Sequence, residues 1–213
     1  MDFGTFTCQY CSTINATEVC NNHYYNCSFC NNVYINYENT LAKPEEIISE
    51  SETMSPIIIG SKGKINGETF EVTGCVTLFQ KRTTINLFSI KWNTGLFGCL
   101  LEFDGDYNVI TSINENPSKE LKNTKLGKEI EIIGFGKAYC YCIDKPAYIA
   151  IKGNGKLVFE KYSNSFLCSY YSQNKKVAFC FFNREHTTLL TGTQYNFNEL
   201  NLSPTRAIND WHK

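Results

Sequence analysis

Two kinds of segment that would place the chain outside the cytoplasm are missing from its sequence. The opening, Met1–Thr7, leads straight into a cysteine and has neither the basic stretch nor the apolar core of a secretory signal. No apolar run in the 213 residues approaches the roughly 18 residues that a transmembrane helix needs. We therefore expect a cytoplasmic protein without a membrane span.

The motifs of the common enzyme classes are also missing. The chain has no Gly-x-Ser-x-Gly, no phosphate-binding loop and no His-Glu-x-x-His. Gly134-Phe135-Gly136 lacks the third glycine and the following helix of a dinucleotide-binding loop. Asp104-Gly105-Asp106 resembles an acidic metal loop, but a hairpin turn accounts for it. No reaction can be named, and an enzyme is kept only as an alternative.

Basic residues are scarce in the first part of the chain. Residues 1–60 hold seven acids and one base, Lys43, which gives a net charge of −6. The whole chain carries −1, so the remainder carries +5. Nucleic-acid binding needs Lys and Arg to neutralise phosphates. The acidic front therefore argues against nucleic acid as a partner, and the basic remainder keeps it as a third hypothesis.

Cysteine is abundant, and four of the eleven cysteines follow a metal-binding pattern. The odd count cannot pair completely into disulfides, so reduced thiols are the better interpretation. Two Cys-x-x-Cys pairs, fifteen residues apart, predict a closed tetrahedral site for one structural Zn²⁺. The predicted ligands are Cys8, Cys11, Cys27 and Cys30.

Three features near these pairs leave questions open. Zinc ribbons usually have glycine after each pair, where this chain has Ser12 and Asn31. Cys20 or His23 could replace a ligand, and a redox Cys-x-x-Cys is the rival interpretation, although the strand-then-helix context for it is missing. Nearby aromatic residues are expected to pack around the site, namely Phe3, Phe6, Tyr24, Tyr25 and Phe29.

Further along the chain, a second site is conceivable. Cys140 and Cys142 are two apart and on a strand would face the same side. With Cys168 and Cys180 they could form a metal or redox site, although buried packing is the commoner role of such cysteines. His186 follows an apolar run and could be a general base, but a surface turn explains it more simply. His212 is expected to be disordered.

Composition divides the chain into three parts and predicts a mainly β fold. We expect a zinc ribbon over 1–37, an acidic linker over 38–56 with an optional short helix from Pro44, and an all-β domain over 57–213. Residues 68–73 alternate polar and apolar side chains, and Asp104-Gly105 between two apolar runs predicts a hairpin. Asn93-Thr94-Gly95 and Asn154-Gly155 predict further turns.

The β domain also contains a weak internal repeat. Segments 67–74 and 127–134 both read Gly-x-x-apolar-Glu-apolar-x-Gly. If the repeat is real, the domain consists of two related antiparallel units, packed as a sandwich or a partly open barrel.

Three short motifs in this β domain resemble a bacterial family, that of domain of unknown function 4178. They are segments 57–65 with 70–74, Trp92 with 100–105, and 192–200, so the resemblance spans about 57–202. The family tends to have an acidic residue and Tyr after the tryptophan, whereas Asn93 and Thr94 follow here. The resemblance implies a zinc ribbon joined to a β-rich body and an accessory role connected with the envelope or stress. It brings no catalytic residues.

The leading functional hypothesis is a zinc-binding interaction module whose partner is a protein or a membrane-associated protein. The alternative is an enzyme with a site between the two β units. An enzyme should show a deep pocket with converging polar groups. A binding module should show an exposed apolar or aromatic patch, and a nucleic-acid binder a stripe of Lys and Arg beside exposed aromatics.

Overall fold

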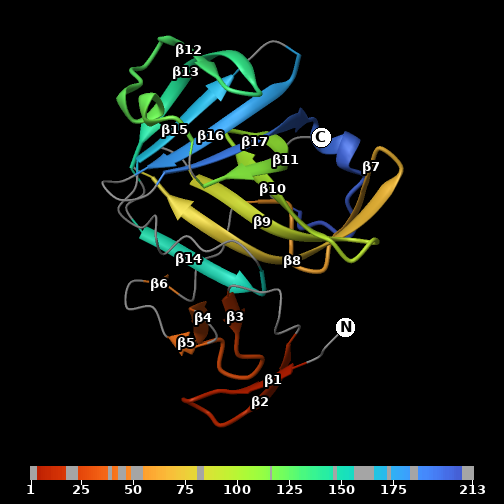
Figure 1. Ribbon diagram of the computed structural model, residues 1–213. Coiled ribbons are helices and arrows are strands. Elements are labelled where there is room, and N and C mark those ends of the chain that lie inside the picture. Colours follow the sequence, from red (N-terminus) through yellow and green to blue (C-terminus); the bar gives the residue numbers. More distant parts are fainter. Residues whose placement is uncertain are drawn as a thin grey trace.

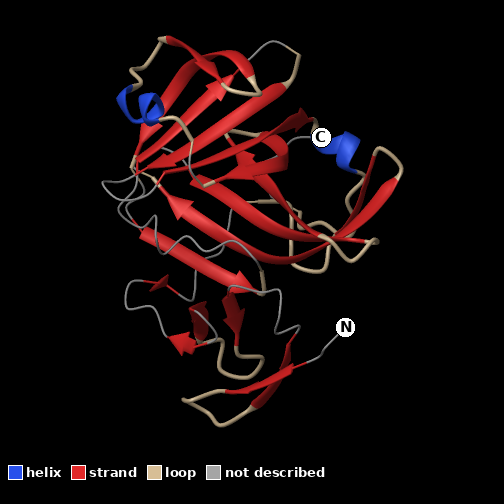
Figure 2. Cartoon of the chain, in the orientation of Figure 1, coloured by secondary structure: helices blue, strands red, loops and turns tan. Residues whose placement is uncertain are grey.

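A computed structural model of the chain confirms the mainly β prediction (Figures 1 and 2). The structure describes residues 4–17, 24–37, 40–42, 47–48, 55–80, 84–115, 117–145, 148–155, 166–171, 174–182 and 187–207. Within these ranges the helical segments are short 3₁₀ turns, η1 (Lys119–Asn123) and η3 (Phe197–Leu200). None of the helical segments described is long and apolar enough to cross a membrane.

The N-terminal part consists of two small hairpins and an added strand. β1 (Gly4–Thr7) pairs with β2 (Ile14–Thr17), and β3 (Tyr24–Asn26) pairs with β4 (Val33–Tyr37). β5 (Thr40–Ala42) extends the second hairpin. Each Cys-x-x-Cys pair lies in the turn that closes one hairpin, so two similar turns carry the four cysteines.

The remaining strands form one sheet, ordered β12-β13-β15-β16-β17-β11-β10-β9-β8-β14-β6, with β7 also paired to β8. All neighbours are antiparallel except β14 and β6. The strands are β6 (Ile47–Ile48), β7 (Lys62–Ile65), β8 (Glu68–Phe79), β9 (Thr84–Trp92), β10 (Phe97–Phe103), β11 (Asp106–Asn114), β12 (Glu129–Ile132), β13 (Gly136–Asp144), β14 (Tyr148–Gly153), β15 (Phe166–Tyr171), β16 (Lys176–Phe182) and β17 (Thr187–Tyr195).

This sheet folds over on itself without closing. Figure 1 shows β12, β13, β15 and β16 as an upper layer and β8, β9 and β14 as a lower one. The main core lies between the layers, because one cluster joins Val76 and Leu87 of the lower layer with Phe179 and Phe181 of the upper one. Bulges in β8, β11 and β13 increase the local bend of the strands.

Two smaller cores cover the outer faces of the fold. Ile65 of β7 and Leu200 of η3 pack over Phe70 and Leu100, and Leu121 of η1 packs over Cys140 and its neighbours. The two units expected from the internal repeat therefore belong to one continuous sheet. Its order interleaves the halves of the chain, because β14 leaves the later strands to pair with β8.

Two of the three turns predicted from the sequence are confirmed. Asp104 and Gly105 both adopt positive φ (53° and 82°) and join β10 to β11, so the predicted hairpin is confirmed. Residues 93–95 turn between β9 and β10, also as predicted. Asn154-Gly155 does not close a hairpin, because Gly155 instead forms a β-bridge with Tyr24 of the N-terminal module.

The segment expected as a linker contributes two strands. β5 joins the second hairpin, and Ile47 and Ile48 of β6 lie parallel to Ile149 and Ala150 of β14. The short helix that was considered would begin at Pro44, and residues 44–46 lie outside the described residues. β6 begins directly after them, at Ile47. The segment thus adds an edge strand to the body sheet.

The N-terminal module is anchored in the body by Tyr24. Its side chain is fully buried in the main core, and its hydroxyl lies 3.1 Å from the hydroxyl of Ser89 in β9. Its backbone exchanges two hydrogen bonds with Gly155. A Cβ at Gly155 would collide with both the Ser89 and Tyr24 hydroxyls, so this contact requires glycine there.

Candidate metal centre

Each cysteine pair is held in a tight turn of the same design. The amide of Cys8 donates to Thr13 O at 2.9 Å, and the amide of Ser12 donates to Cys8 O at 2.9 Å. The second turn repeats this pattern, with Cys27 donating to Asn32 O at 2.9 Å and Asn31 to Cys27 O at 3.0 Å. These bonds fold both sulfurs of each pair toward the same point.

The residue after each pair adopts the left-handed conformation. Ser12 has φ 60° and Asn31 has φ 56°, in the positions where zinc ribbons usually have glycine. Asn adopts this region more readily than other residues with a Cβ, and Ser does so at a conformational cost. Both turns therefore keep the geometry that glycine would give them.

The turns bring the four sulfurs together from both hairpins. All four Sγ atoms lie within 4.8 Å of one another. Cys8 Sγ is 3.5 Å from Cys30 Sγ, and Cys11 Sγ is 3.5 Å from Cys27 Sγ. These distances exceed the roughly 2.05 Å of a disulfide, and the cysteines are free. Within the described ranges, no other group of three or more His, Cys, Asp or Glu residues has such an arrangement.

Polar groups surround the sulfurs and point at them. The Tyr34 hydroxyl accepts from the Gln9 amide at 3.0 Å and lies 3.2 Å from Cys8 Sγ, to which it can donate. Asn15 Nδ2 is 3.6 Å from Cys27 Sγ, and Asn32 Nδ2 is 3.1 Å from Cys30 Sγ. Donors of this kind stabilise thiolates and orient metal ligands.

The charge balance of the cluster favours a bound cation. Burial opposes ionisation of Cys8, but hydrogen bonds from Tyr34 and the backbone at Cys11 and Tyr10 lower its pKa to about 6. Thr13 favours the Cys11 thiolate, yet burial and the thiols of Cys8 and Cys27 raise its pKa to about 11. Four thiolates this close repel one another unless a cation lies between them. The four cysteines can therefore bind a metal ion.

The aromatic residues around the site divide into two groups. Phe6, Tyr25 and Tyr34 pack against Cys8 and Cys27 as expected of residues beside the site. Tyr24 packs in the body core instead. Phe29 was expected to pack as well, but its side chain is 77% exposed, so that prediction is wrong. Its position inside the turn, between Cys27 and Cys30, directs it outward. Phe3, Cys20 and His23 lie outside the described residues.

Among the body cysteines whose side chains the structure describes, Cys140, Cys142 and Cys180 do not come together as the second site that the spacing allowed. A bulge shifts the register of β13, so that Cys140 opposes Tyr170 while Cys142 opposes Ser169. Neighbouring residues of β15 face opposite sides of the sheet, so the two cysteines also face opposite sides. Cys140 packs with Cys180 in an outer core, and Cys142 borders the main core.

The structure describes only some of the other residues that were considered for a site in the body. Cys168 opposes Cys180 in the sheet, but its side chain lies outside what the structure describes. His186 and His212 lie outside the described residues as well. Burial raises the pKa of the Cys180 thiol to about 12, which keeps it protonated at neutral pH. Gly134-Phe135-Gly136 is the turn between β12 and β13 rather than a nucleotide loop.

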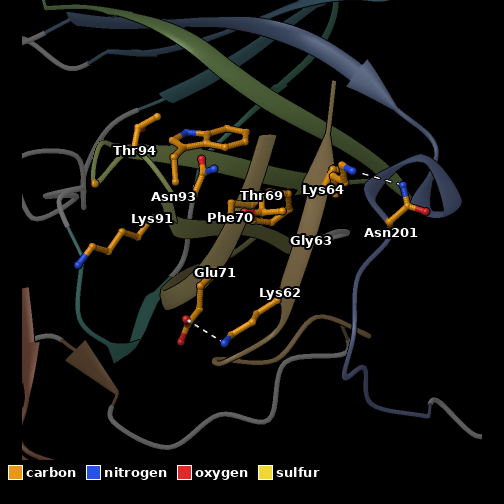
Figure 3. A pocket seen from close by; sticks show the side chains of 12 residues that line it. Lys62, Gly63, Lys64, Thr69, Phe70, Glu71, Lys91, Asn93, Thr94 and Asn201 are labelled. Carbon is orange, nitrogen blue, oxygen red and sulfur yellow. Dashed lines mark hydrogen bonds and ion pairs between the residues drawn. The ribbon is translucent and has the colours of Figure 1, made fainter. Parts of the chain in front are cut away.

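An open groove of about 690 Å³ over the ends of β7, β8 and β9 is a separate candidate (Figure 3). Its charged residues are Lys62, Lys64, Glu71 and Lys91. Lys62, Glu71 and Lys91 lie opposite one another across three strands, and Lys62 Nζ is 3.8 Å from Glu71 Oε2. Cross-strand charge pairs of this kind are typical of a solvated sheet face.

Phe70 and Trp92 also line the groove, but neither ring is exposed as a stacking surface. Phe70 is buried and opposes the partly buried Trp92, and their rings pack edge to face at 5.3 Å within a core cluster. Glu71 also interrupts the row of positive charge. The groove therefore lacks the combination of lysines and exposed aromatics that single-stranded nucleic acid requires.

Comparisons with protein-family models, curated proteins and solved structures find no match for this chain. The resemblance to the family of domain of unknown function 4178 therefore stays a prediction.

Proposed function

We propose that the protein is a zinc-stabilised interaction module, in which one structural Zn²⁺ bound by Cys8, Cys11, Cys27 and Cys30 fixes two hairpins for contact with a protein partner. The observation that carries this proposal is the mutual approach of the four sulfurs within 4.8 Å. With Zn–S bonds of about 2.3 Å, a tetrahedral zinc site has sulfurs about 3.8 Å apart. The two measured separations of 3.5 Å are close to this value.

A four-cysteine site is suited to structure rather than catalysis. Tetrahedral zinc with four protein ligands has no position for water or substrate. The module has little apolar core of its own, so the free energy of metal binding would contribute directly to its folding. Reduced thiolates also need a reducing compartment, which supports a cytoplasmic location as part of the proposal.

The turns present apolar side chains to solvent in equivalent positions. Tyr10 and Phe29 each precede the second cysteine of a pair and are 59% and 77% exposed. Ile14, which follows the first turn, is 71% exposed. Exposed apolar groups on a rigid support are typical of a protein-binding surface. The resemblance to the family of domain of unknown function 4178 suggests an accessory role in the envelope or in stress.

Metal content of the purified full chain tests the zinc site. We expect one zinc per chain in the wild type and none in Cys27→Ser. Cys142→Ala, a change at a partly buried body cysteine, is the matched control and should keep one zinc. Absence of zinc from the wild type, or its loss in both variants, would refute the assignment of these ligands.

A comparison of bound proteins tests the interaction surface. Phe29→Ser and Tyr10→Ser should retain one zinc and lose a defined partner that wild type captures. Leu126→Ser is the control, because Leu126 is 64% exposed but lies on the body. If all three variants retain the same partners, the turn aromatics are not the contact surface.

A further inference from the structure

A second group of exposed aromatic residues lies at the open edge of the folded sheet. Tyr139 and Tyr141 of β13 and Tyr171 of β15 are 54%, 43% and 45% exposed. Tyr139 and Tyr171 are directly opposite each other across the two strands. We call these three residues the tyrosine patch. Such a patch differs from scattered surface tyrosines because its members are neighbours on the same strands.

All three rings are on the inner face of the sheet. Tyr139 and Tyr171 alternate with Cys140 and Tyr170, which pack in an outer core. Tyr171 also opposes Val177, a member of the main core between the layers. Successive residues of a strand face opposite sides, so Tyr139 and Tyr171 line the space between the layers where it opens to solvent.

The bulge in β13 brings Tyr141 to the same opening. Its ring centroid is 6.0 Å from that of Phe103, which in turn packs edge to face with Phe179 at 6.2 Å. Phe103 is the last residue of β10, immediately before the Asp104-Gly105 turn. Tyr141 of the patch therefore lies beside the end of β10 that leads into the β10–β11 turn.

The opening is acidic as well as aromatic. Asp104 directly follows Phe103, whose ring packs against Tyr141, and Asp106 follows in the same turn. Burial raises the pKa of the Tyr141 phenol, Ser169 opposes this shift, and the carboxylates of Asp106 and Asp104 raise the pKa further. Their side chains are on an exposed turn. Glu129 accepts from the Tyr139 hydroxyl at 2.7 Å and pairs with Lys137 at 2.9 Å. Asp104 and Asp106 form no ion pair with another described residue.

The tyrosine rings and the carboxylates are together complementary to an arginine side chain. The faces of tyrosine rings attract cations, and guanidinium stacks on them. Carboxylates pair with guanidinium through two parallel hydrogen bonds. From the tyrosine patch together with Asp104 and Asp106, we infer a binding site for an arginine side chain presented by a peptide segment of a partner protein. This inference does not depend on the zinc site.

NMR titration of the full-length protein with acetyl-Gly-Arg-Gly-amide tests the inference. Amide shifts should change in β13, β15 and the β10–β11 turn, and the binding should weaken as salt is raised. Acetyl-Gly-Glu-Gly-amide should cause no such changes. Shifts located elsewhere, or equal binding of the glutamate peptide, would overturn the assignment.

Substitutions then show which side chains bind the arginine peptide. Tyr171→Leu and Tyr141→Leu should each weaken binding about two- to fivefold, the range expected for one exposed cation–π contact. Asp106→Asn should weaken it and reduce its salt dependence. Leu96→Ala is the control, because Leu96 is 68% exposed but lies in the β9–β10 turn, at the other end of β10, and it should leave binding unchanged. Equal weakening by Leu96→Ala would contradict the site.

A comparison with choline distinguishes a site for arginine from a site for another cation. Choline has a quaternary ammonium group that binds aromatic rings but cannot form paired hydrogen bonds with a carboxylate. We expect choline to bind more weakly than the arginine peptide and to be less sensitive to Asp106→Asn. Tighter choline binding would overturn the arginine assignment in favour of a substituted-ammonium site. Because the tyrosine and aspartate variants should all retain one zinc, these outcomes are distinguishable from failure of the zinc proposal.

Discussion

The N-terminal module and the β body bury their side chains in different ways. The module's own cluster consists of Phe6, Tyr25 and Tyr34 around two buried and two partly buried cysteines. Among the residues that the structure describes, the main core of the body contains sixteen buried side chains from both layers of the sheet. Two of these sixteen, Tyr24 and Val33, come from the module. The body buries a large apolar core, whereas the module buries few side chains of its own and packs Tyr24 and Val33 into the core of the body.

This difference follows from size. Small domains bury too little apolar surface to offset their conformational entropy, and they commonly use a metal ion or disulfides in addition. The second hairpin ends in a cysteine turn on one side and carries Tyr24 on the other. One short element thus links the proposed zinc site to the core of the body.

The largest mutational effect is expected in the body core. Phe179→Ala should lower the free energy of unfolding of the body by about 3–5 kcal/mol, because it removes a fully buried ring. Denaturant unfolding followed by fluorescence measures this change. The metal content should not change. Phe29→Ala is the control, since its ring is exposed and its loss should cost under about 0.5 kcal/mol. A loss of metal in Phe179→Ala would contradict metal binding by the cysteine turns independently of the packing around Phe179.

A smaller effect is expected at the junction between the regions. Tyr24→Phe removes the hydroxyl beside Ser89 and leaves that buried group with one partner fewer, which should cost about 1–3 kcal/mol. The double variant Tyr24→Phe/Ser89→Ala should cost less than the sum of the two single changes. Equilibrium unfolding of the wild type and the three variants gives the coupling free energy between the two hydroxyls. If the effects simply add, the two hydroxyls do not join the regions.

A still smaller change is expected in the cysteine turns. Ser12→Gly should relieve the left-handed conformation and stabilise the metal-bound module by about 0.5–1 kcal/mol, net of the entropy of glycine. Competition with a zinc chelator measures this as tighter binding. Asn31→Gly is the comparison and should have a smaller effect, because Asn already tolerates that conformation. Weaker zinc binding by Ser12→Gly would show that Ser12 is not strained.

The smallest effect concerns the free edge of the body sheet. Hydrogen bonds from Tyr139 and Lys137 lower the pKa of Glu129, so its folded-state pKa lies below the unfolded value. Its contribution to stability should be present above the unfolded pKa and be lost as the pH falls through the folded one. Glu129→Gln should therefore slightly lower the melting temperature at pH 7 and leave it unchanged near pH 3. Equal lowering of the melting temperature at pH 7 and at pH 3 would contradict this account of Glu129.

Local sequence patterns predict the features that local geometry determines. The spacing of Cys8, Cys11, Cys27 and Cys30 brings their sulfurs together because each turn closes within a few residues. The Asp104-Gly105 hairpin is predictable for the same reason. Of the motifs that carry the predicted resemblance to the family of domain of unknown function 4178, Asp104-Gly105 is explained locally as a turn, whereas Gly192 lies against the backbone of Val109 in the neighbouring strand.

Features that depend on distant partners were not predictable. The bulge in β13 reverses the alternation on which the Cys140 and Cys142 prediction rested, and nothing in the short motif signals it. Tyr24 resembles its neighbour Tyr25 in sequence, yet its partners Ser89 and Gly155 come from far along the chain. The strand order is likewise set by long-range pairing, which periodicity does not encode.

Hydrogen exchange with and without a zinc chelator tests the central claim most directly, because it reports both regions of the full chain at once. The amides of Cys27 and Asn31 are hydrogen-bonded in the second cysteine turn, and those of β9 and β10 lie in the body sheet. Removal of the metal should abolish protection in the cysteine turns and leave the central strands protected. Unchanged protection of the turns, or collapse of the whole body with them, would contradict the account.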